Sequence, residues 1–208
     1  MERSHSLVRT LTPELVLDAY RQGVFPMAHG KTGPVEFYYY EPRAILPLDE
    51  RFTVRRSLRR EIHKHTFDIR FDTAFNEVIT ACSRHDELQD EGVWLSEGMI
   101  GIYSELHRRG IAHSVEAWTT TGDQPELVGG LYGLAFGGAF CGESMFSRVA
   151  FASQVALVAL VDHLREKEFT LLDAQMKSQH LEQFGLFTTS QKEYLEVLRN
   201  AMLADCEW

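Results

Sequence analysis

A glycine-rich apolar run places the strongest constraint on how this chain can fold. The run LVGGLYGLAFGGAFCGESMFS covers residues 127–147 and consists mostly of glycine with apolar and aromatic residues. Gly137-Gly138 divides it into two strand-like halves, which predicts a hairpin with a two-residue turn. Glycine weakens a strand, and a carboxylate such as Glu143 needs a partner when it is buried. The run therefore predicts a buried hairpin that a ligand or neighbouring backbone approaches closely.

Patterns on either side of this hairpin predict an α+β fold with a central, mostly antiparallel sheet. The elements expected before it are a helix over 13–22 capped by Thr12, a loop over 24–34, a short strand within 36–48, a basic helix ending near 65, a strand over 66–71, a helix capped by Asp72, a helix over 96–109 and a strand over 113–118. Those expected after it are a helix over 153–167, a strand over 170–175, a short helix ending at Gly185 and a last helix opened by the capping-box pair Ser190 and Glu193. We expect a small N-terminal α/β domain with the basic helix over residues 1–65 and a larger domain over 66–208.

Charge is spread unevenly along the chain. The net charge of −9 argues against a general nucleic-acid binder, which usually carries a basic face. Residues 51–64, RFTVRRSLRREIHK, nevertheless hold six arginines and lysines against Glu61. A run of this kind is more often a solvated helix face, and the alternative is a local phosphate-binding patch.

Several other patterns limit the class of protein. The three cysteines, Cys82, Cys141 and Cys206, lie far apart and favour reduced thiols in a cytoplasmic protein. The longest apolar stretch, 155–161, is too short to span a bilayer, and MERSHSLVRT lacks the apolar core of a signal peptide. The histidines of HKH at 63–65 fall on different faces of a helix, so we expect no metal site there.

The predicted order of elements resembles the acetyltransferase-like fold of the GNAT class, and a set of motifs resembles something narrower. The motifs are AYRQGVFPM (19–27), EPRAILPL (41–48), HSVEAW (113–118), the glycine-rich run, ASQVAL (152–157) and LLDAQ with HLEQFG (171–185). Together they resemble the leucyl/phenylalanyl-tRNA–protein transferases over roughly residues 12 to 198. That resemblance implies an enzyme without a cofactor. It would move leucine or phenylalanine from aminoacyl-tRNA to proteins with an N-terminal Arg or Lys, marking them for degradation, and would have no membrane partner.

The resemblance also implies roles for individual residues. It assigns the catalytic work to Asp173, Gln175 and Glu143, and the first two alternate on one strand, so their side chains should share a face. Whether Asp173 accepts a proton or orients the acceptor stays open. The pocket for the leucyl or phenylalanyl side chain would comprise Leu131, Phe140, Leu157 and Leu160. The terminal adenosine of the tRNA would contact Trp94 and Tyr103, and its phosphates would contact Arg55, Arg56, Arg59, Arg60 and Lys64.

Two other functions are compatible with the predicted fold. The first is an acetyl-CoA-dependent N-acetyltransferase, which needs a glycine-bearing pyrophosphate loop between strand and helix. The corresponding segment, RVAFAS over 148–153, contains no glycine. The second is a non-catalytic RNA- or peptide-binding relative, against which the joint presence of Asp173, Gln175 and Glu143 argues. Departures from the family pattern affect the tRNA side: aromatic residues 37–40 replace a tryptophan, Gln154 replaces a lysine, and the tract before Trp94 is acidic.

Overall fold

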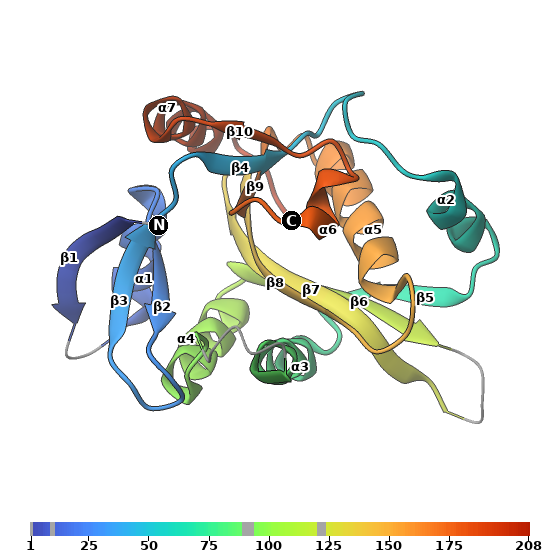
Figure 1. Ribbon diagram of the computed structural model, residues 1–208, viewed down its shortest axis with the longest axis horizontal. Helices are drawn as coiled ribbons and strands as arrows, with labels where there is room; N and C mark the ends of the chain where they lie inside the picture. Colours follow the sequence, from blue (N-terminus) through green and yellow to red (C-terminus); the bar gives the residue numbers. More distant parts are fainter. Residues whose placement is uncertain (1, 9–10, 89–93, 120–123) are drawn as a thin grey trace.

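The computed structural model describes residues 2–8, 11–88, 94–119 and 124–208, and in these ranges the strands form two sheets (Figure 1). The smaller sheet has the order β1-β3-β2 and contains β1 (Glu2–Val8), β2 (Phe25–Ala28) and β3 (Val35–Tyr39). The larger has the order β10-β4-β9-β8-β7-β6-β5. Its strands are β4 (Arg43–Leu46), β5 (Phe67–Phe71), β6 (Ala112–Thr119), β7 (Glu126–Phe136), β8 (Ala139–Ser147), β9 (Leu171–Gln175) and β10 (Phe187–Thr189). Neighbouring strands in both sheets run antiparallel except for β8 and β9, which are parallel. The predicted α+β class with a mostly antiparallel sheet is confirmed.

Helices cover both faces of the larger sheet. The helices of the described residues are α1 (Pro13–Arg21), α2 (Arg56–His63), α3 (Phe75–Leu88), α4 (Glu97–Arg108), α5 (Ala152–Glu166), α6 (Gln179–Glu182) and α7 (Gln191–Met202). α5 lies on one face, and α3 and α4 lie on the other (Figure 1). The predicted caps are confirmed: Thr12, Ser96 and Ser190 accept from the first-turn backbone, and Glu193 completes the capping box. Among the described residues, no helix is long and apolar enough to cross a membrane.

Several expected elements differ from the structure, mostly where strands are short. The predicted loop over 24–34 contains β2, whose Pro26 is tolerated because β2 lies at a sheet edge. The single strand expected within 36–48 is two strands in two different sheets, and β10 was not predicted at all. In the acidic tract over 85–92, residues 85–88 belong to α3 and residues 89–92 lie outside the described residues.

Asp72 does not cap α3, as the sequence had suggested. Its backbone has φ +57, and its carboxylate accepts from the backbone of Ser114 (2.8 Å) and bonds to Nδ1 of His113 (2.8 Å). The carboxylate of Glu116, on β6, accepts instead from the backbone N–H groups of Thr73 and Ala74 (3.2 Å each). A residue distant in sequence has taken the role of the local cap.

The expected division at residue 65 does not coincide with the division between the two sheets. β4 precedes residue 65 and pairs inside the larger sheet. Leu58 of α2 is buried in the same hydrophobic cluster as Leu164 of α5. We therefore propose that the N-terminal unit, made of α1 and the smaller sheet, ends close to residue 43.

Glycines in the β7–β8 hairpin permit close approach of neighbouring backbone. A Cβ at Gly133 would lie 2.4 Å from the carbonyl oxygen of Cys141, on the paired strand. A Cβ at Gly129 would lie 2.5 Å from the Cβ of Ala152, where α5 begins. The close approach predicted for this run is therefore an approach of strand to strand and of helix to strand.

Candidate active site

The parallel strands β8 and β9 stay paired for only three residues. Their register runs from Ala139 opposite Leu171 to Cys141 opposite Asp173. Just beyond this point β8 carries a bulge: Gly142 faces Gly133 and Ser144 faces Tyr132 on β7, so Glu143 is the extra residue. Bulges re-aim side chains and are common beside active sites.

A second irregularity follows at the same level of β9. Ala44 pairs with Gln175 and Ile45 with Asp173, which leaves Ala174 as the extra residue. Gln175 has φ +58, and its side-chain nitrogen donates to the carbonyl of Gly142 (3.2 Å) and to Oε1 of Glu143 (3.0 Å). The Gln175 side chain thus bridges the two strands where their backbone pairing has ended.

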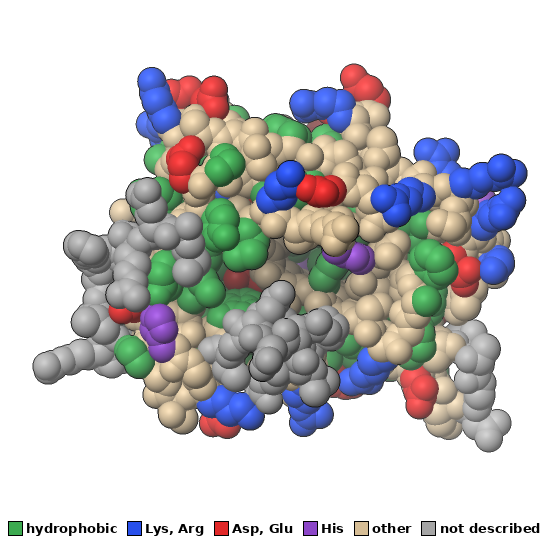
Figure 2. All heavy atoms as spheres, viewed as in Figure 1, with side chains coloured by type: hydrophobic (Ala, Val, Ile, Leu, Met, Phe, Trp, Pro, Cys, Tyr) green, Lys and Arg blue, Asp and Glu red, His purple; other side chains and the backbone are tan. Residues whose placement is uncertain are grey.

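An apolar cavity of about 110 Å³ opens beside this bridge. Six leucines from β4, β7, α5, β9 and α6 line it: Leu46, Leu131, Leu157, Leu160, Leu172 and Leu181. Glu143 contributes a carboxylate to the lining. Figure 2 shows hydrophobic side chains around a hollow in the middle of this face. The structure brings three of the four expected pocket residues to one cavity.

Phe140 is the exception among the expected pocket residues. It is fully buried, lies outside the group of described residues that line the cavity, and stacks on Trp208 with ring centroids 5.3 Å apart. Phe140 thus belongs to the same hydrophobic cluster as Leu131, Leu157 and Leu160 without lining the cavity itself.

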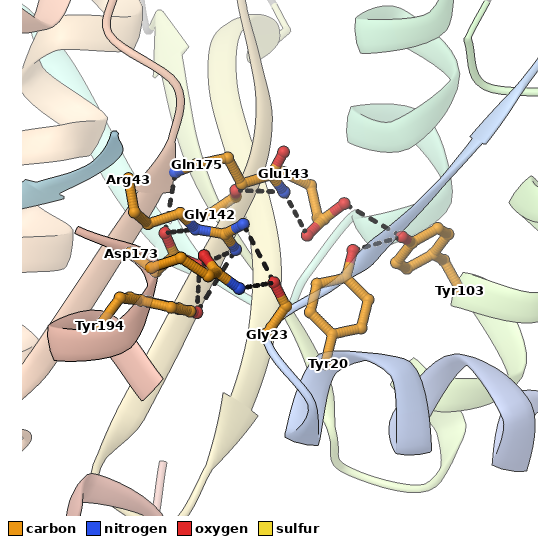
Figure 3. A network of polar contacts seen from close by, with 10 residues as sticks. Tyr20, Gly23, Arg43, Tyr103, Gly142, Glu143, Asp173, Gln175 and Tyr194 are labelled. Atoms are coloured by element: carbon orange, nitrogen blue, oxygen red, sulfur yellow. Dashed lines mark hydrogen bonds and ion pairs between the residues drawn. The ribbon is translucent and has the colours of Figure 1, made fainter. Parts of the chain in front are cut away.

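Asp173 is completely buried, and each of its oxygens accepts two hydrogen bonds (Figure 3). Arg43 donates from Nε to Oδ1 (2.9 Å) and from Nη2 to Oδ2 (2.5 Å). The backbone N–H of Gln175 donates to Oδ1 (2.9 Å), and the hydroxyl of Tyr194 donates to Oδ2 (2.8 Å). This carboxylate is saturated, so its geometry suits an anchor for β9 better than a proton acceptor.

Arg43 was missed by the sequence reasoning. It is fully buried, its guanidinium lies 4.5 Å from the ring centre of Tyr194, and Nη1 donates to the carbonyl of Gly23 (3.3 Å). Burial disfavours its charge, but the adjacent Asp173 carboxylate outweighs this and raises the pKa of Arg43 above its ordinary value. The available signal was an arginine inside the apolar stretch EPRAIL, where a cation requires a buried partner.

Glu143 has the opposite environment to Asp173. Burial raises its pKa from 4.5 to about 7, while hydrogen bonding by Tyr20 and Tyr103 opposes this rise and the negative charge of Asp173 adds to it. Tyr103 donates to Oε2 (3.0 Å), and Gln175 donates to Oε1 (3.0 Å), which leaves accepting capacity on both oxygens. A partly exposed carboxylate with a pKa near neutrality is suited to accept and return a proton.

The two aromatic residues expected to bind adenosine lie in different environments. Trp94 is half-buried and packs against the core formed by α3 and α4. Tyr103 is completely buried, with its hydroxyl turned to Glu143 and its ring against Tyr132. A ring with no exposed face cannot stack on a base here, so the expected role of Tyr103 does not fit this structure.

The basic residues expected to bind phosphate lie on α2, which packs against the outer side of α5. Arg55, Arg56, Arg59, Arg60 and Lys64 are all exposed. Figure 2 shows lysine and arginine side chains gathered on the side of the molecule where Figure 1 has α2. Arg59 donates to the carbonyl of Val54 (3.0 Å), and Lys64 pairs with Glu61 (3.0 Å). Within the described ranges, no group of three His, Cys, Asp or Glu side chains is arranged to hold a metal ion.

Comparison with known proteins gives two matching family models. Residues 45–199 match "Leucyl/phenylalanyl-tRNA protein transferase", and residues 9–43 match the N-terminal domain of the same family. A leucyl/phenylalanyl-tRNA–protein transferase of Akkermansia muciniphila is 48% identical over 92% of this chain and 96% of its own. One of Herpetosiphon aurantiacus is 48% identical over 94% and 97%. Among solved structures, FemX matches with a TM-score of 0.56 at 12% identity, over 73% of this chain and 60% of that one, which is a likeness of fold.

Proposed function

This chain belongs to the leucyl/phenylalanyl-tRNA–protein transferase family, and we propose that Glu143 and Gln175 form the centre at which it acts. The enzyme is an aminoacyltransferase that moves an aminoacyl group from tRNA to the N-terminus of a protein. One observation carries the assignment of the centre. Glu143 and Gln175 meet at the edge of an apolar cavity, where β8 and β9 cease to pair.

The reaction joins an amine to an activated ester. The acceptor's α-amino nitrogen attacks the ester carbonyl carbon, a C–N bond forms, and the C–O bond to the tRNA ribose breaks. The amine loses a proton, and the leaving ribose oxygen gains one. Because an α-amine has a pKa of about 7.7–8.0, much of it is protonated near neutrality and a nearby proton acceptor speeds the attack.

Glu143 is our choice for that proton acceptor. Its carboxylate lines the cavity, has a pKa of about 7 and retains free accepting capacity. It can take the proton from the attacking amine and return it to the ribose oxygen. Asp173 acts at one remove: its four hydrogen bonds hold β9 and the backbone of Gln175 in place.

Gln175 supplies the second contact to the amine. Its Nε2 lies within hydrogen-bond distance of two acceptors, the carbonyl of Gly142 and the carboxylate of Glu143. That arrangement fixes the amide orientation and leaves Oε1 as the atom that accepts from the acceptor's α-amine. In Figure 3, Oε1 points away from both partners of Nε2.

The leucine-lined cavity would hold the aminoacyl side chain. Its volume of about 110 Å³ is somewhat below the roughly 150 Å³ of an apolar cavity known to accept benzene. Leucine therefore fits better than phenylalanine unless the walls move. Branching at Cβ would crowd the entrance, so isoleucine and valine should be poor donors.

The remaining partners follow from charge and family. We propose that the exposed arginines of α2 hold tRNA phosphates and that acceptor proteins carry an N-terminal Arg or Lys, whose modification marks them for degradation. We further propose that the domain is of the GNAT class, since the parallel pair β8–β9 with α5 between them lies in an otherwise antiparallel sheet. The reaction would take place in the cytoplasm, where aminoacyl-tRNA is made and used. A CoA-dependent acetyl transfer has no support beyond the fold.

A single-turnover transfer assay tests this assignment. Leucyl-tRNA is the donor, and an Arg-initiated peptide is the acceptor. We expect Glu143→Gln to slow transfer by about 10²- to 10⁴-fold, the usual contribution of a positioned acid or base. The matched control is Glu182→Gln on α6, whose carboxylate pairs with Lys177 at the surface (2.7 Å) and which should stay within about twofold of wild type. A Glu143→Gln variant as fast as the control would remove Glu143 from the mechanism.

A further inference from the structure

Two buried tyrosines connect the N-terminal unit to Glu143. Tyr20 lies on α1 and Tyr103 on α4, and both are almost or fully buried at 1% and 0% exposure. Their hydroxyl oxygens are 2.8 Å apart, and the Tyr103 hydroxyl donates to Oε2 of Glu143 (3.0 Å). Figure 3 shows the two tyrosines on the opposite side of Glu143 from Gln175, with their hydroxyls turned toward each other and toward the Glu143 carboxylate.

The chemistry of the groups fixes which of them donates in each of these hydrogen bonds. An ionised carboxylate only accepts hydrogen bonds, so Tyr103 donates its one hydroxyl proton to Glu143. The Tyr20 hydroxyl must then donate to the Tyr103 oxygen. Both tyrosines stay protonated, because burial first and the charge of Glu143 next raise their pKa values well above the ordinary one.

We propose that Tyr20 and Tyr103 are positioning residues for aminoacyl transfer, forming a relay from Tyr20 through Tyr103 that fixes the carboxylate of Glu143 at the cavity. The proposal rests on the role of Glu143 given above. Through it the N-terminal unit supports the active site by holding the carboxylate of Glu143.

A second contact supports the same connection. The turn that follows α1 places the carbonyl of Gly23 against Arg43 Nη1 (3.3 Å), and Arg43 holds Asp173. The contact that leads to Glu143, at Tyr20, and the one that leads to Asp173, at Gly23, are therefore only three positions apart in the chain. A Cβ at Gly23 would lie 2.7 Å from a side-chain carbon of Leu195, so α7 packs closely against this turn.

The groups that face Glu143 come from five elements. They are Tyr20 on α1, Tyr103 on α4, Arg43 on β4, Asp173 on β9 and Cys141 on β8 itself. Arg43 and Asp173 are paired with each other and are unaffected by a Tyr→Phe change. Cys141 stays a neutral thiol, because burial raises its pKa well above the ordinary value. A shift in the titration of Glu143 on removing a tyrosine hydroxyl therefore reports the relay.

The test compares pH profiles of kcat for wild type, Tyr20→Phe, Tyr103→Phe and Glu143→Gln, with leucyl-tRNA saturating. The wild-type rate should rise through a limb near pH 7 that Glu143→Gln removes. Tyr20→Phe and Tyr103→Phe should each move this limb up by roughly half to one pH unit, because fewer hydrogen bonds then favour the carboxylate. The α-amine of the acceptor titrates equally in every variant, so differences between profiles isolate Glu143.

The matched control is Tyr38→Phe, a buried tyrosine of the smaller sheet that also donates to a carboxylate, that of Glu36 (2.6 Å). It should leave the limb in place. A second readout is independent of activity: ¹³C-labelled glutamate carboxyls titrated by NMR in the free enzyme, with Glu143 identified by its absence in Glu143→Gln. If Tyr103→Phe fails to fold, Tyr20→Phe decides alone. If Tyr20→Phe moves neither the limb nor the NMR midpoint, the relay is overturned and the proposed function stands. If the wild-type profile has no limb that depends on Glu143, the proposed function itself is overturned.

Discussion

Replacing Glu143 by glutamine should stabilise the fold at alkaline pH while it slows transfer. Burial raises the pKa of this carboxyl from 4.5 to about 7, so the folded state holds a proton that the unfolded state releases. Below pH 4.5 both states are protonated, and Glu143 causes no loss of stability. Stability then falls as pH rises to about 7, above which the full loss is present. At about 1.36 kcal/mol per pKa unit the loss is at most about 3 kcal/mol, and solvent at the partly exposed side chain reduces it.

Urea unfolding of wild type and Glu143→Gln at pH 5 and pH 8.5, at constant ionic strength, measures this effect. The substitution places an amide against Gln175, but that contribution does not titrate and cancels in the pH difference. We compare the free energy of unfolding of Glu143→Gln with that of wild type at each pH. This difference should be about 1–3 kcal/mol more favourable to the variant at pH 8.5 than at pH 5. Glu182→Gln is the control and should show no such gain. If the stability difference between Glu143→Gln and wild type were the same at both pH values, the reasoning would be refuted, because a raised pKa would then contribute nothing to it.

Three other experiments test the remaining parts of the site. Arg43→Met leaves the Asp173 carboxylate buried without its partner and should lower the free energy of unfolding, measured by urea unfolding, by about 3–5 kcal/mol. Adding Asp173→Asn to the same chain should restore part of the lost free energy. Arg56→Ala with Arg60→Ala should weaken tRNA binding and reduce its log–log salt slope by about one per lost phosphate contact, measured by filter binding. Leu160→Ala enlarges the cavity and should raise phenylalanine over leucine transfer by about tenfold in a competition assay. A stable Arg43→Met, an unchanged salt slope or an unchanged transfer ratio would contradict the corresponding prediction.

Local signals in the sequence were sufficient for most helices. Thr12 with Pro13, Ser96 and the Ser190–Glu193 box each act within one turn, so they can be read without knowing the fold. β2 and β10 gave no comparable signal, since four and three residues are too few for a pattern and their partners lie elsewhere in the chain. The Asp72 cap failed because Glu116, from another strand, already satisfied that backbone.

The candidate site could likewise be predicted only in part. The residue types were identified from motifs, but their roles depend on contacts between distant segments. Asp173 and Glu143 are both carboxylates within apolar strands, and nothing in their neighbours along the chain distinguishes them. Arg43, 130 residues away from Asp173, makes one an anchor, whereas burial raises the pKa of the other to about 7.

The bulge at Glu143 explains why a carboxylate stands in an apolar strand. Phe140 and Phe146 are six residues apart, so an unbroken strand would turn both to the same face. In the structure Phe140 packs on the α5 side, with Leu131 and Leu157, whereas Phe146 packs on the α3 side with Val78. One extra residue between them reverses the alternation, and each phenylalanine enters its own core. Glu143 is that residue, released from pairing with β7 and placed at the cavity. The same irregularity that completes two hydrophobic cores thus provides the position for a carboxylate, and the stability lost on ionising it is the consequence of holding it where it can react.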